Sequence, residues 1–308
     1  MLRAFFVRLS ENSSLRNFAE RSSLGRSVSG RFVAGTGIAD AVRATQAINR
    51  AGMSVSIDNL GENVTNPEEA RHSALLYQHI LDAIVANQLN ANISLKLTHM
   101  GLDVDENLAR ELVRGLVAKS AAMKPPGFVR VDMEGSPYTQ GTLDFVHELH
   151  RIPGNANSVG TVIQAYLRRS EGDIENLLAE GIRIRLCKGA YKEPAEIAFS
   201  AKSEVDANYV KLMKILMKSG IYHGLATHDE GIIRQAKAFA IAEKLSHDSF
   251  EFQMLYGIRR DLQQSLLREG WRVRVYIPFG TEWYPYFMRR LGERPANVLF
   301  IARNLVRA

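Results

Sequence analysis

Short runs of β-branched and apolar residues alternate along the chain with longer stretches whose apolar residues recur every three or four positions. The first pattern predicts buried strands and the second predicts amphipathic helices. We expect eight strands, at residues 54–58, 92–97, 128–133, 160–165, 182–187, 222–227, 250–255 and 273–277. Eight alternations of strand and helix predict an α/β fold closed into a (β/α)8 barrel of the TIM type, with an open doubly wound sheet as the alternative.

The C-terminal segment YPYFMRRLGERPAN, residues 284–297, contains two adjacent arginines. Helical spacing over residues 283–293 places Tyr286, Arg289, Arg290 and Glu293 on one face. Pro295 predicts that this helix ends near Glu293, because residues before a proline avoid helical dihedral angles. The face either binds an anion or is simply exposed to solvent, with Glu293 paired to Arg289.

The first thirty residues mix apolar residues with arginines and serines and contain no long apolar run. A secretory signal or a transmembrane span is therefore not expected. Leu2, Phe5, Phe6 and Leu9 recur at helical spacing, which predicts a short basic amphipathic helix that packs on the domain or lies on a membrane surface. A transit peptide has a similar composition. We divide the chain into a helical lead-in, residues 1–30, and one barrel domain, residues 31–308.

The composition is that of an ordinary globular protein, with 308 residues, 46% hydrophobic and 23% charged, and a net charge of +6. The excess of positive charge favours anionic ligands, but no nucleic-acid-binding module accompanies it. Cys187 is the single cysteine, which excludes an intramolecular disulfide and a thiolate metal cluster. A reducing, cytoplasmic location is the default expectation.

Polar residues fall at or just beyond the ends of successive predicted strands. They are Asp58, Glu62, Lys96, Asp132, Glu134, Gln164, Arg185, Lys188, Thr227, His228, Gln253 and Tyr276. In a parallel barrel these ends converge on one mouth, where active sites of this fold are built. Any one of these residues could be a structural polar group, but their recurrence at nearly every strand predicts an active site.

Three weaker motifs receive structural interpretations. GTGIAD, residues 35–40, lacks the last glycine of a dinucleotide-binding loop, and we expect it to open a helix. HELH places His147 and His150 three residues apart, which predicts a solvent-facing helix end, and no metal site is expected. Cys187 ends a predicted buried strand, where cysteine commonly serves as a small hydrophobic residue.

The segment IRIRLCKGAY, residues 182–191, is more informative. Alternation places Arg183 and Arg185 on the same strand face, and an inward guanidinium requires an electron-rich partner. Lys188 and Gly189 then offer a charge and a close backbone approach to a phosphate, which predicts a phosphorylated cofactor across the barrel mouth. On neighbouring strands Lys96 and Asp132 are placed to form an ion pair; Lys96 could bind a carboxylate or form a Schiff base.

Taken together, these segments resemble the proline dehydrogenases, both the monofunctional bacterial enzymes and the first half of the bifunctional proline-catabolising proteins. The matching segments, in family order, are RFVAG (31–35), SIDNLGE (56–62), SLKLT (94–98), VRVDMEGS (129–136), VIQAY (162–166), IRLCKGAY (184–191), VDANY (205–209), ATHD (226–229), FEFQMLYG (250–257), VYIPFG (275–280) and YPYFMRRLGER (284–294). The resemblance implies a distorted eight-stranded barrel that binds FAD noncovalently, with N-terminal helices and the last helix over the barrel mouth.

The resemblance also implies roles for individual residues. Asp132 and Arg185 match catalytic positions, with Asp132 ordering Lys96 and Arg185 lying near the flavin N5. Lys96, Arg289 and Arg290 match contacts to the substrate carboxylate, and Glu62 matches the partner of Arg289 that closes the site. The remaining matches are Leu255, Tyr276 and Tyr286 around the substrate ring, and Met133, Gln164, Arg185, Lys188, Gly189, Ala190, Thr227, His228 and Glu293 around the cofactor.

Two positions depart from the family pattern. Cys187 stands where valine is common, and Lys192 stands where the bifunctional enzymes usually have tryptophan, so the adenine end of FAD is expected to be held differently.

The implied reaction is oxidation of L-proline to 1-pyrroline-5-carboxylate, the first step of proline degradation to glutamate, with electrons passed from FAD to a membrane quinone. That acceptor would give the basic N-terminal region a reason to contact lipid as a peripheral segment. The alternatives are a hydroxyproline dehydrogenase, which the bulk of Tyr276 disfavours, a Schiff-base aldolase that uses Lys96 or Lys188, and a barrel that only binds an anion.

Overall fold

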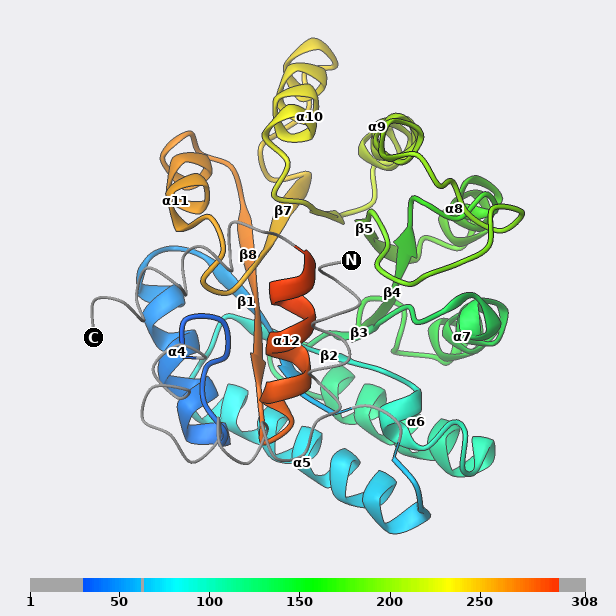
Figure 1. Cartoon of the computed structure of the whole chain (residues 1–308). Coiled ribbons are helices and arrows are strands. Elements are labelled where there is room, and N and C mark those ends of the chain that lie inside the picture. Colours follow the sequence, from blue (N-terminus) through cyan, green and yellow to red (C-terminus); the bar gives the residue numbers. More distant parts are fainter. Residues whose placement is uncertain (1–29, 62–63, 294–308) are drawn as a thin grey trace.

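Eight parallel strands close into a barrel in the computed structural model, which describes residues 30–61 and 64–293, with only the backbone of residues 289–293. The helices that alternate with the strands surround this barrel (Figure 1). The strands are β1 (Ser54–Asn59), β2 (Ala91–Leu95), β3 (Val129–Val131), β4 (Val159–Gln164), β5 (Arg183–Cys187), β6 (His223–Ala226), β7 (Phe250–Leu255) and β8 (Val273–Phe279). The barrel prediction is confirmed, and the open-sheet alternative is excluded because β1 also pairs with β8.

Nine α-helices and one short 3-10 helix are present among the described residues. They are α4 (Ile38–Arg50), α5 (Pro67–Ala86), η1 (Thr98–Met100), α6 (Glu106–Ala121), α7 (Ser136–Arg151), α8 (Ser170–Ala179), α9 (Lys202–Lys218), α10 (Glu230–Ala242), α11 (Arg260–Arg268) and α12 (Trp283–Glu293). All eight predicted strands are found, and their ends differ from the predictions by no more than about two residues, the usual uncertainty of strand and helix ends. The predicted lead-in, residues 1–30, lies almost entirely outside the described residues.

Local sequence signals explain several helix starts. The Asn66 side chain accepts a hydrogen bond from the Glu69 amide with Pro67 at the first helical position, so α5 begins with a side-chain cap. GTGIAD opens α4 as predicted, and the Asp40 carboxylate accepts hydrogen bonds from the amides of Thr36 and Gly37. His147 differs from expectation: it is half-buried, with Nδ1 2.9 Å from Glu180 Oε1.

Helix α12 follows β8 and packs across the C-terminal end of the barrel, in front of the strands in Figure 1. Its aromatic residues Trp283 and Phe287 form a separate apolar cluster with Phe32 and with Leu60, which follows β1. The chain before α4 is tied to the same end of the barrel, because the Ala34 amide donates to the Pro278 carbonyl at 2.9 Å. The last helix therefore covers the barrel mouth, as the resemblance implied.

The apolar core lies mainly between the strands and the surrounding helices. Inside the barrel, by contrast, the β-strand alternation turns several polar residues inward at two levels. Ser56, Ser94, Arg185 and Gln253 are buried toward the C-terminal end, and Arg130 and Glu251 are buried toward the N-terminal end. None of the helices within the described ranges is long and apolar enough to cross a membrane.

Candidate active site at the barrel mouth

Asp132 directly follows β3 and is the centre of a buried polar network. Its Oδ1 lies 2.8 Å from Arg185 Nη1 and accepts a hydrogen bond of 2.7 Å from Ser94 Oγ. Tyr276 Oη donates to Asp132 Oδ2 at 3.1 Å. Contributions from β2, β3, β5 and β8 therefore meet at one carboxylate, which the barrel closure makes possible.

Arg185 is 6% exposed and has a hydrogen-bond partner at each of its nitrogens. Besides Asp132, its Nε donates to Gln253 Oε1 at 2.5 Å and its Nη2 to Ser56 Oγ at 3.2 Å. This arrangement satisfies the predicted need for an electron-rich partner, because an unpaired guanidinium would be costly at this depth. These hydrogen bonds hold the Arg185 side chain in one orientation, so its positive charge has a fixed position at the barrel mouth.

Gln253 occupies a tight position beneath Arg185. A Cβ atom added to Gly224, on the neighbouring strand β6, would lie 2.2 Å from Gln253 Nε2, far inside van der Waals contact. Glycine at position 224 therefore leaves the room in which the Gln253 amide supports the guanidinium.

Lys96 has a different partner from the one we expected. Its recorded ion pair is with Asp58, at 3.8 Å between Nζ and Oδ2, whereas Asp132 pairs with Arg185. Burial raises the pKa of Asp58 to about 6, although the Lys96 ammonium opposes this shift and the Asp132 carboxylate adds to it. Two carboxylates and two cations thus stand close together at the mouth, with Asp58 able to gain a proton just below neutral pH.

Lys188 follows β5 and is held between two carboxylates. Its Nζ lies 2.5 Å from Asp206 Oδ1 and 2.9 Å from Asp229 Oδ2. Burial alone would raise the pKa of Asp229, but hydrogen bonding and attraction to Lys188 lower it to about 2. Both aspartates also pair with Lys202, so two carboxylates are shared by two ammonium groups. The role of Lys188 toward a phosphate stays a prediction.

The loop after β5 brings backbone close to an aromatic ring. Gly189 adopts a φ angle of +107°, and a Cβ atom there would lie 2.1 Å from the Tyr166 ring. Glycine is thus required at the position where the sequence predicted a close approach to a ligand.

The other predicted cofactor residues surround the same mouth. Gln164 Nε2 donates to the Glu134 carbonyl at 2.8 Å, and Thr227 Oγ1 accepts from the Asp229 amide at 3.0 Å. His228 Nε2 accepts from the Leu255 amide at 2.9 Å, so Nδ1 is the donor nitrogen of this ring. Met133 is buried and Leu255 is half-buried; Ala190 lies beside Gly189.

Carboxylates fix the loops after β2 and β3, a feature that residue patterns did not reveal. The Glu134 carboxylate accepts from the Thr98 amide at 3.1 Å and from Thr98 Oγ1 at 2.6 Å. Glu193 binds the Ser136 amide and hydroxyl in the same way, at 2.8 and 2.6 Å. Glu134 was predicted from its place at a strand end, whereas nothing in the spacing of Glu193 pointed to the start of α7.

Several predicted residues remain untested. Glu62 lies outside the described residues, and Arg289, Arg290 and Glu293 are placed by the backbone of α12 alone. Tyr286 is buried on α12 at the mouth. The predicted contacts of Glu62 with Arg289 and of both arginines with substrate therefore stay predictions.

Cys187 lies at the end of β5, as predicted, and burial raises the pKa of its thiol to about 11. A protonated thiol is a poor nucleophile, which supports its interpretation as a small hydrophobic residue.

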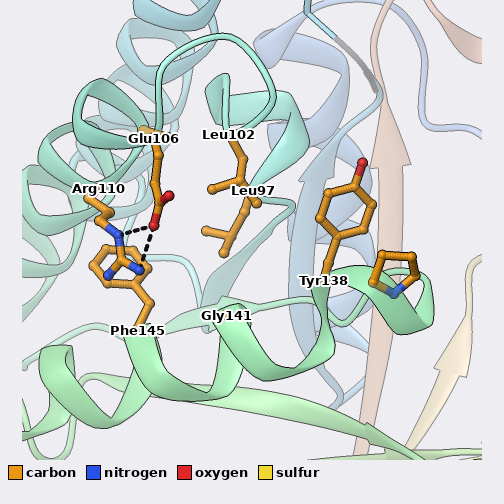
Figure 2. Close-up of a pocket in the computed structure, with 9 residues that line it drawn as sticks. Leu97, Leu102, Glu106, Arg110, Tyr138, Gly141 and Phe145 are labelled. Atoms are coloured by element: carbon orange, nitrogen blue, oxygen red, sulfur yellow. Dashed lines mark hydrogen bonds and ion pairs between the residues drawn. The ribbon is translucent and has the colours of Figure 1, made fainter.

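A cavity of about 180 Å³ lies outside the barrel between α6 and α7. Figure 2 shows Leu97, Leu102 and Phe145 around it, with Glu106 and Arg110 joined by an ion pair 2.8 Å long. The Arg110 guanidinium also lies 4.7 Å from the centre of the Phe145 ring. None of the predicted site residues lines this cavity, so we place the candidate active site at the barrel mouth.

Comparisons with known proteins match most of the chain to one family. Residues 41–303 match the protein family described as Proline dehydrogenase. Proline dehydrogenase 1 of Bacillus subtilis (strain 168) is 40% identical over the full length of both chains. Proline dehydrogenase of Deinococcus radiodurans is 42% identical over 90% of this chain and 89% of the relative.

A crystal structure of proline utilization A (PutA) from Bdellovibrio bacteriovorus, inactivated by N-propargylglycine, has a similar fold, with a TM-score of 0.80 and 25% identity. The similarity covers 87% of this chain and 32% of that protein.

Proposed function

The chain belongs to the proline dehydrogenase family, and on that premise we propose that it oxidises L-proline to 1-pyrroline-5-carboxylate with noncovalently bound FAD. The observation that supports this most strongly is the Arg185–Asp132 pair, buried at the mouth of the barrel and bonded by Ser94 and Tyr276. A cation fixed in this way can stabilise charge that develops on a neighbouring group without reorganising.

The residues at the mouth fit a flavin cofactor. The buried amide of Gln164, the guanidinium of Arg185 and the hydroxyl of Thr227 come from β4, β5 and the end of β6, and they supply polar groups along one wall. The Gly189 backbone packs against the Tyr166 ring, and we propose that the loop they form borders the bound cofactor. Lys188 would orient such a group through its charge only if Asp206 or Asp229 released part of its contact.

Bound there, the flavin would supply the hydride acceptor at N5, which is the chemistry of the cofactor and not of the protein. The protein supplies position. We propose that Arg289, Arg290 and Lys96 bind the proline carboxylate, because planar guanidinium groups form bidentate contacts with carboxylates. Fixing the carboxylate holds the ring carbon next to nitrogen in one orientation, and such positioning accounts for much of the rate of a two-component reaction.

Hydride leaves the ring carbon next to nitrogen when the nitrogen carries a free lone pair, so the site must favour loss of the ammonium proton of proline. Asp132 orders Arg185, and Tyr276 donates to Asp132. The bulky Tyr276 phenol, bonded to Asp132 at the mouth, would leave little room for a ring hydroxyl. We therefore propose proline as the substrate in preference to hydroxyproline.

By the same family relationship we propose that the reduced cofactor passes its electrons to a membrane quinone, with the protein in the cytoplasm or peripheral on the membrane. The expected peripheral segment, residues 1–30, lies almost wholly outside the described residues.

The test is the visible absorption spectrum of the purified protein. We expect the spectrum of an oxidised flavin, bleaching on anaerobic addition of L-proline, and recovery on addition of a water-soluble quinone. Bleaching by hydroxyproline at an equal rate would contradict the proposed specificity, and failure of the quinone to restore colour would contradict the proposed acceptor. A protein that stays colourless after incubation with FAD would exclude the proposed function, and reductive trapping on Lys96 or Lys188 would then favour the aldolase alternative.

A further inference from the structure

Arginines gather at the N-terminal end of the barrel, opposite the candidate active site. A depression of about 500 Å³ is lined there by Arg183, Arg272 and Arg274, together with Tyr222, Asn157 and Gly181. These residues begin or immediately precede β4, β5, β6 and β8. Arg130, on β3, lies directly beneath them, because its Nη1 donates to the Arg183 carbonyl at 2.7 Å. We call these four arginines the basal arginine cluster.

Only part of this positive charge has a carboxylate partner. Arg274 Nε lies 2.6 Å from Glu251 Oε1, and this buried acid also accepts from Tyr222 Oη at 2.9 Å. Arg272 pairs with Asp248 at 2.5 Å on the surface, where its side chain is 51% exposed. Two carboxylates therefore face four guanidinium groups among the described residues.

Arg183 is the clearest member of the cluster without an ion pair among the described residues. Its guanidinium carbon lies 4.3 Å from the centre of the Phe128 ring and 5.0 Å from that of Tyr222. The residues that the structure describes give it no ion pair, only a long Nε bond of 3.4 Å to the Tyr222 carbonyl. Burial lowers the pKa of Arg183, although the Glu251 carboxylate opposes this shift, as expected for a buried cation that is compensated only in part.

Arg130 contributes a second guanidinium group that is only partly hydrogen-bonded among the described residues. The residue is 2% exposed, and its Nε has no hydrogen-bond partner within the described part of the chain. Its Nη1 donates to the carbonyls of Thr161 and Arg183. Buried polar groups usually have partners, so an orphaned guanidinium nitrogen in this position requires an explanation.

The surroundings leave room for the cluster. A Cβ atom on Gly160 would lie 2.2 Å from the Arg183 carbonyl and 2.8 Å from the Phe128 ring, so glycine makes space for the stacked arginines. His223 lies beside them, and burial together with Arg130 and Arg183 lowers its pKa to about 3. It accepts the Ile184 amide at Nδ1 and is therefore a neutral neighbour that does not add to the positive charge.

We propose that the basal arginine cluster binds a small multivalent oxyanion, a di- or polycarboxylate or a phosphorylated compound, through Arg183 and Arg272. Guanidinium forks match carboxylate and phosphate oxygens, and the unpaired charge favours a ligand with more than one negative group. Gly181 has a φ angle of +78° with open space where a side chain would stand, so the ligand can approach its backbone. The volume is that of a small-molecule site.

Binding of this anion does not depend on the proposed reaction, and it is tested on the protein saturated with FAD, so that any nucleotide site at the other end is filled. Pyrophosphate and malonate are titrated by calorimetry at low salt. We expect binding of one anion per chain, weakened by added salt. Arg183→Ala and Arg272→Glu should each lower the affinity at least about tenfold. The preferred probe distinguishes phosphate from carboxylate ligands.

Arg268→Glu is the matched control, because Arg268 is an exposed arginine near the same end of the barrel and does not line the depression. It changes the net charge as Arg272→Glu does and should bind the probe with wild-type affinity. If Arg183→Ala does not fold, the comparison of these two glutamate variants decides. Absence of binding by both probes, unchanged affinity in Arg272→Glu, or equal losses in the two variants would overturn the proposal.

Discussion

Both ends of the barrel interior contain an arginine paired with a carboxylate, but the two pairs differ in depth. At the C-terminal end the Asp132 side chain is 13% exposed, whereas at the N-terminal end that of Glu251 is 3% exposed. Gln253 joins them, accepting from Arg185 and donating to Glu251 at 2.7 Å. The carboxylate is therefore the partner nearer to solvent at the C-terminal end, whereas at the N-terminal end that partner is Arg274, at 12% exposed. A buried carboxylate at the N-terminal end fits the usual division of such barrels, with catalysis at the C-terminal face and stability at the N-terminal face.

The largest effect on stability is expected from Arg274→Met. This change leaves the Glu251 carboxylate buried without its cation, and loss of one partner of a buried pair costs about 3–5 kcal/mol. Arg185→Met should cost less, because Asp132 lies nearer to solvent and keeps its bonds from Ser94 and Tyr276. Urea unfolding at neutral pH measures both losses.

The double variant Glu251→Gln/Arg274→Met is the control for this comparison. It removes the charge together with its partner, so it should recover most of the lost stability. Equal losses of unfolding free energy in Arg274→Met and Arg185→Met would contradict the proposed effect of the deeper burial of Glu251.

A smaller effect on folding stability is expected when the pH is lowered, through one buried histidine at each end of the barrel. Burial and then Lys96 lower the pKa of His99 to about 4, and burial and then the arginines lower that of His223 to about 3. The unfolded chain therefore takes up these protons first, and stability present above pH 6.5 is lost as the pH falls. The loss is roughly 1 to 1.5 kcal/mol per histidine at pH 5.5.

Urea unfolding of His99→Gln and His223→Gln at pH 7.5 and 5.5 checks this. Each variant should lose less stability on acidification than the wild type. An unchanged dependence on pH in both would show that neither buried histidine contributes.

Sequence patterns predicted the barrel well because inward alternation and helical spacing are local. They located the Trp283–Glu293 helix and the strand-end residues Asp132, Arg185 and Tyr276 without any knowledge of contacts. They failed for partners that come from different elements. Asp206 is on α9 and Asp229 caps α10, and no spacing brings both to Lys188.

The ion pair of Lys96 with Asp58 was missed for a related reason. Adjacency of β2 and β3 suggested Asp132, but β2 has two neighbours, and the carboxylate of Asp58 on β1 is equally near in the sheet. Strand order alone does not choose between neighbours, and Arg185 from across the barrel takes Asp132 instead.

Three members of the basal arginine cluster share a sequence signal. Arg130, Arg183 and Arg274 each follow the first apolar residue of a short strand in runs such as VRV and IRI. Alternation predicts all three on the inward face, but their strands are far apart in the sequence, and only the closed barrel brings them together.

The most direct test of the central claim is the anaerobic rate at which L-proline bleaches the bound flavin in two matched variants, Arg185→Lys and Arg274→Lys. Both keep the charge and remove the planar fork. We predict that Arg185→Lys slows bleaching at least about tenfold, equivalent to about 1.4 kcal/mol, while Arg274→Lys reacts close to the wild-type rate. Wild-type bleaching in Arg185→Lys, or an equal loss in both, would contradict the placement of the chemistry at the C-terminal mouth.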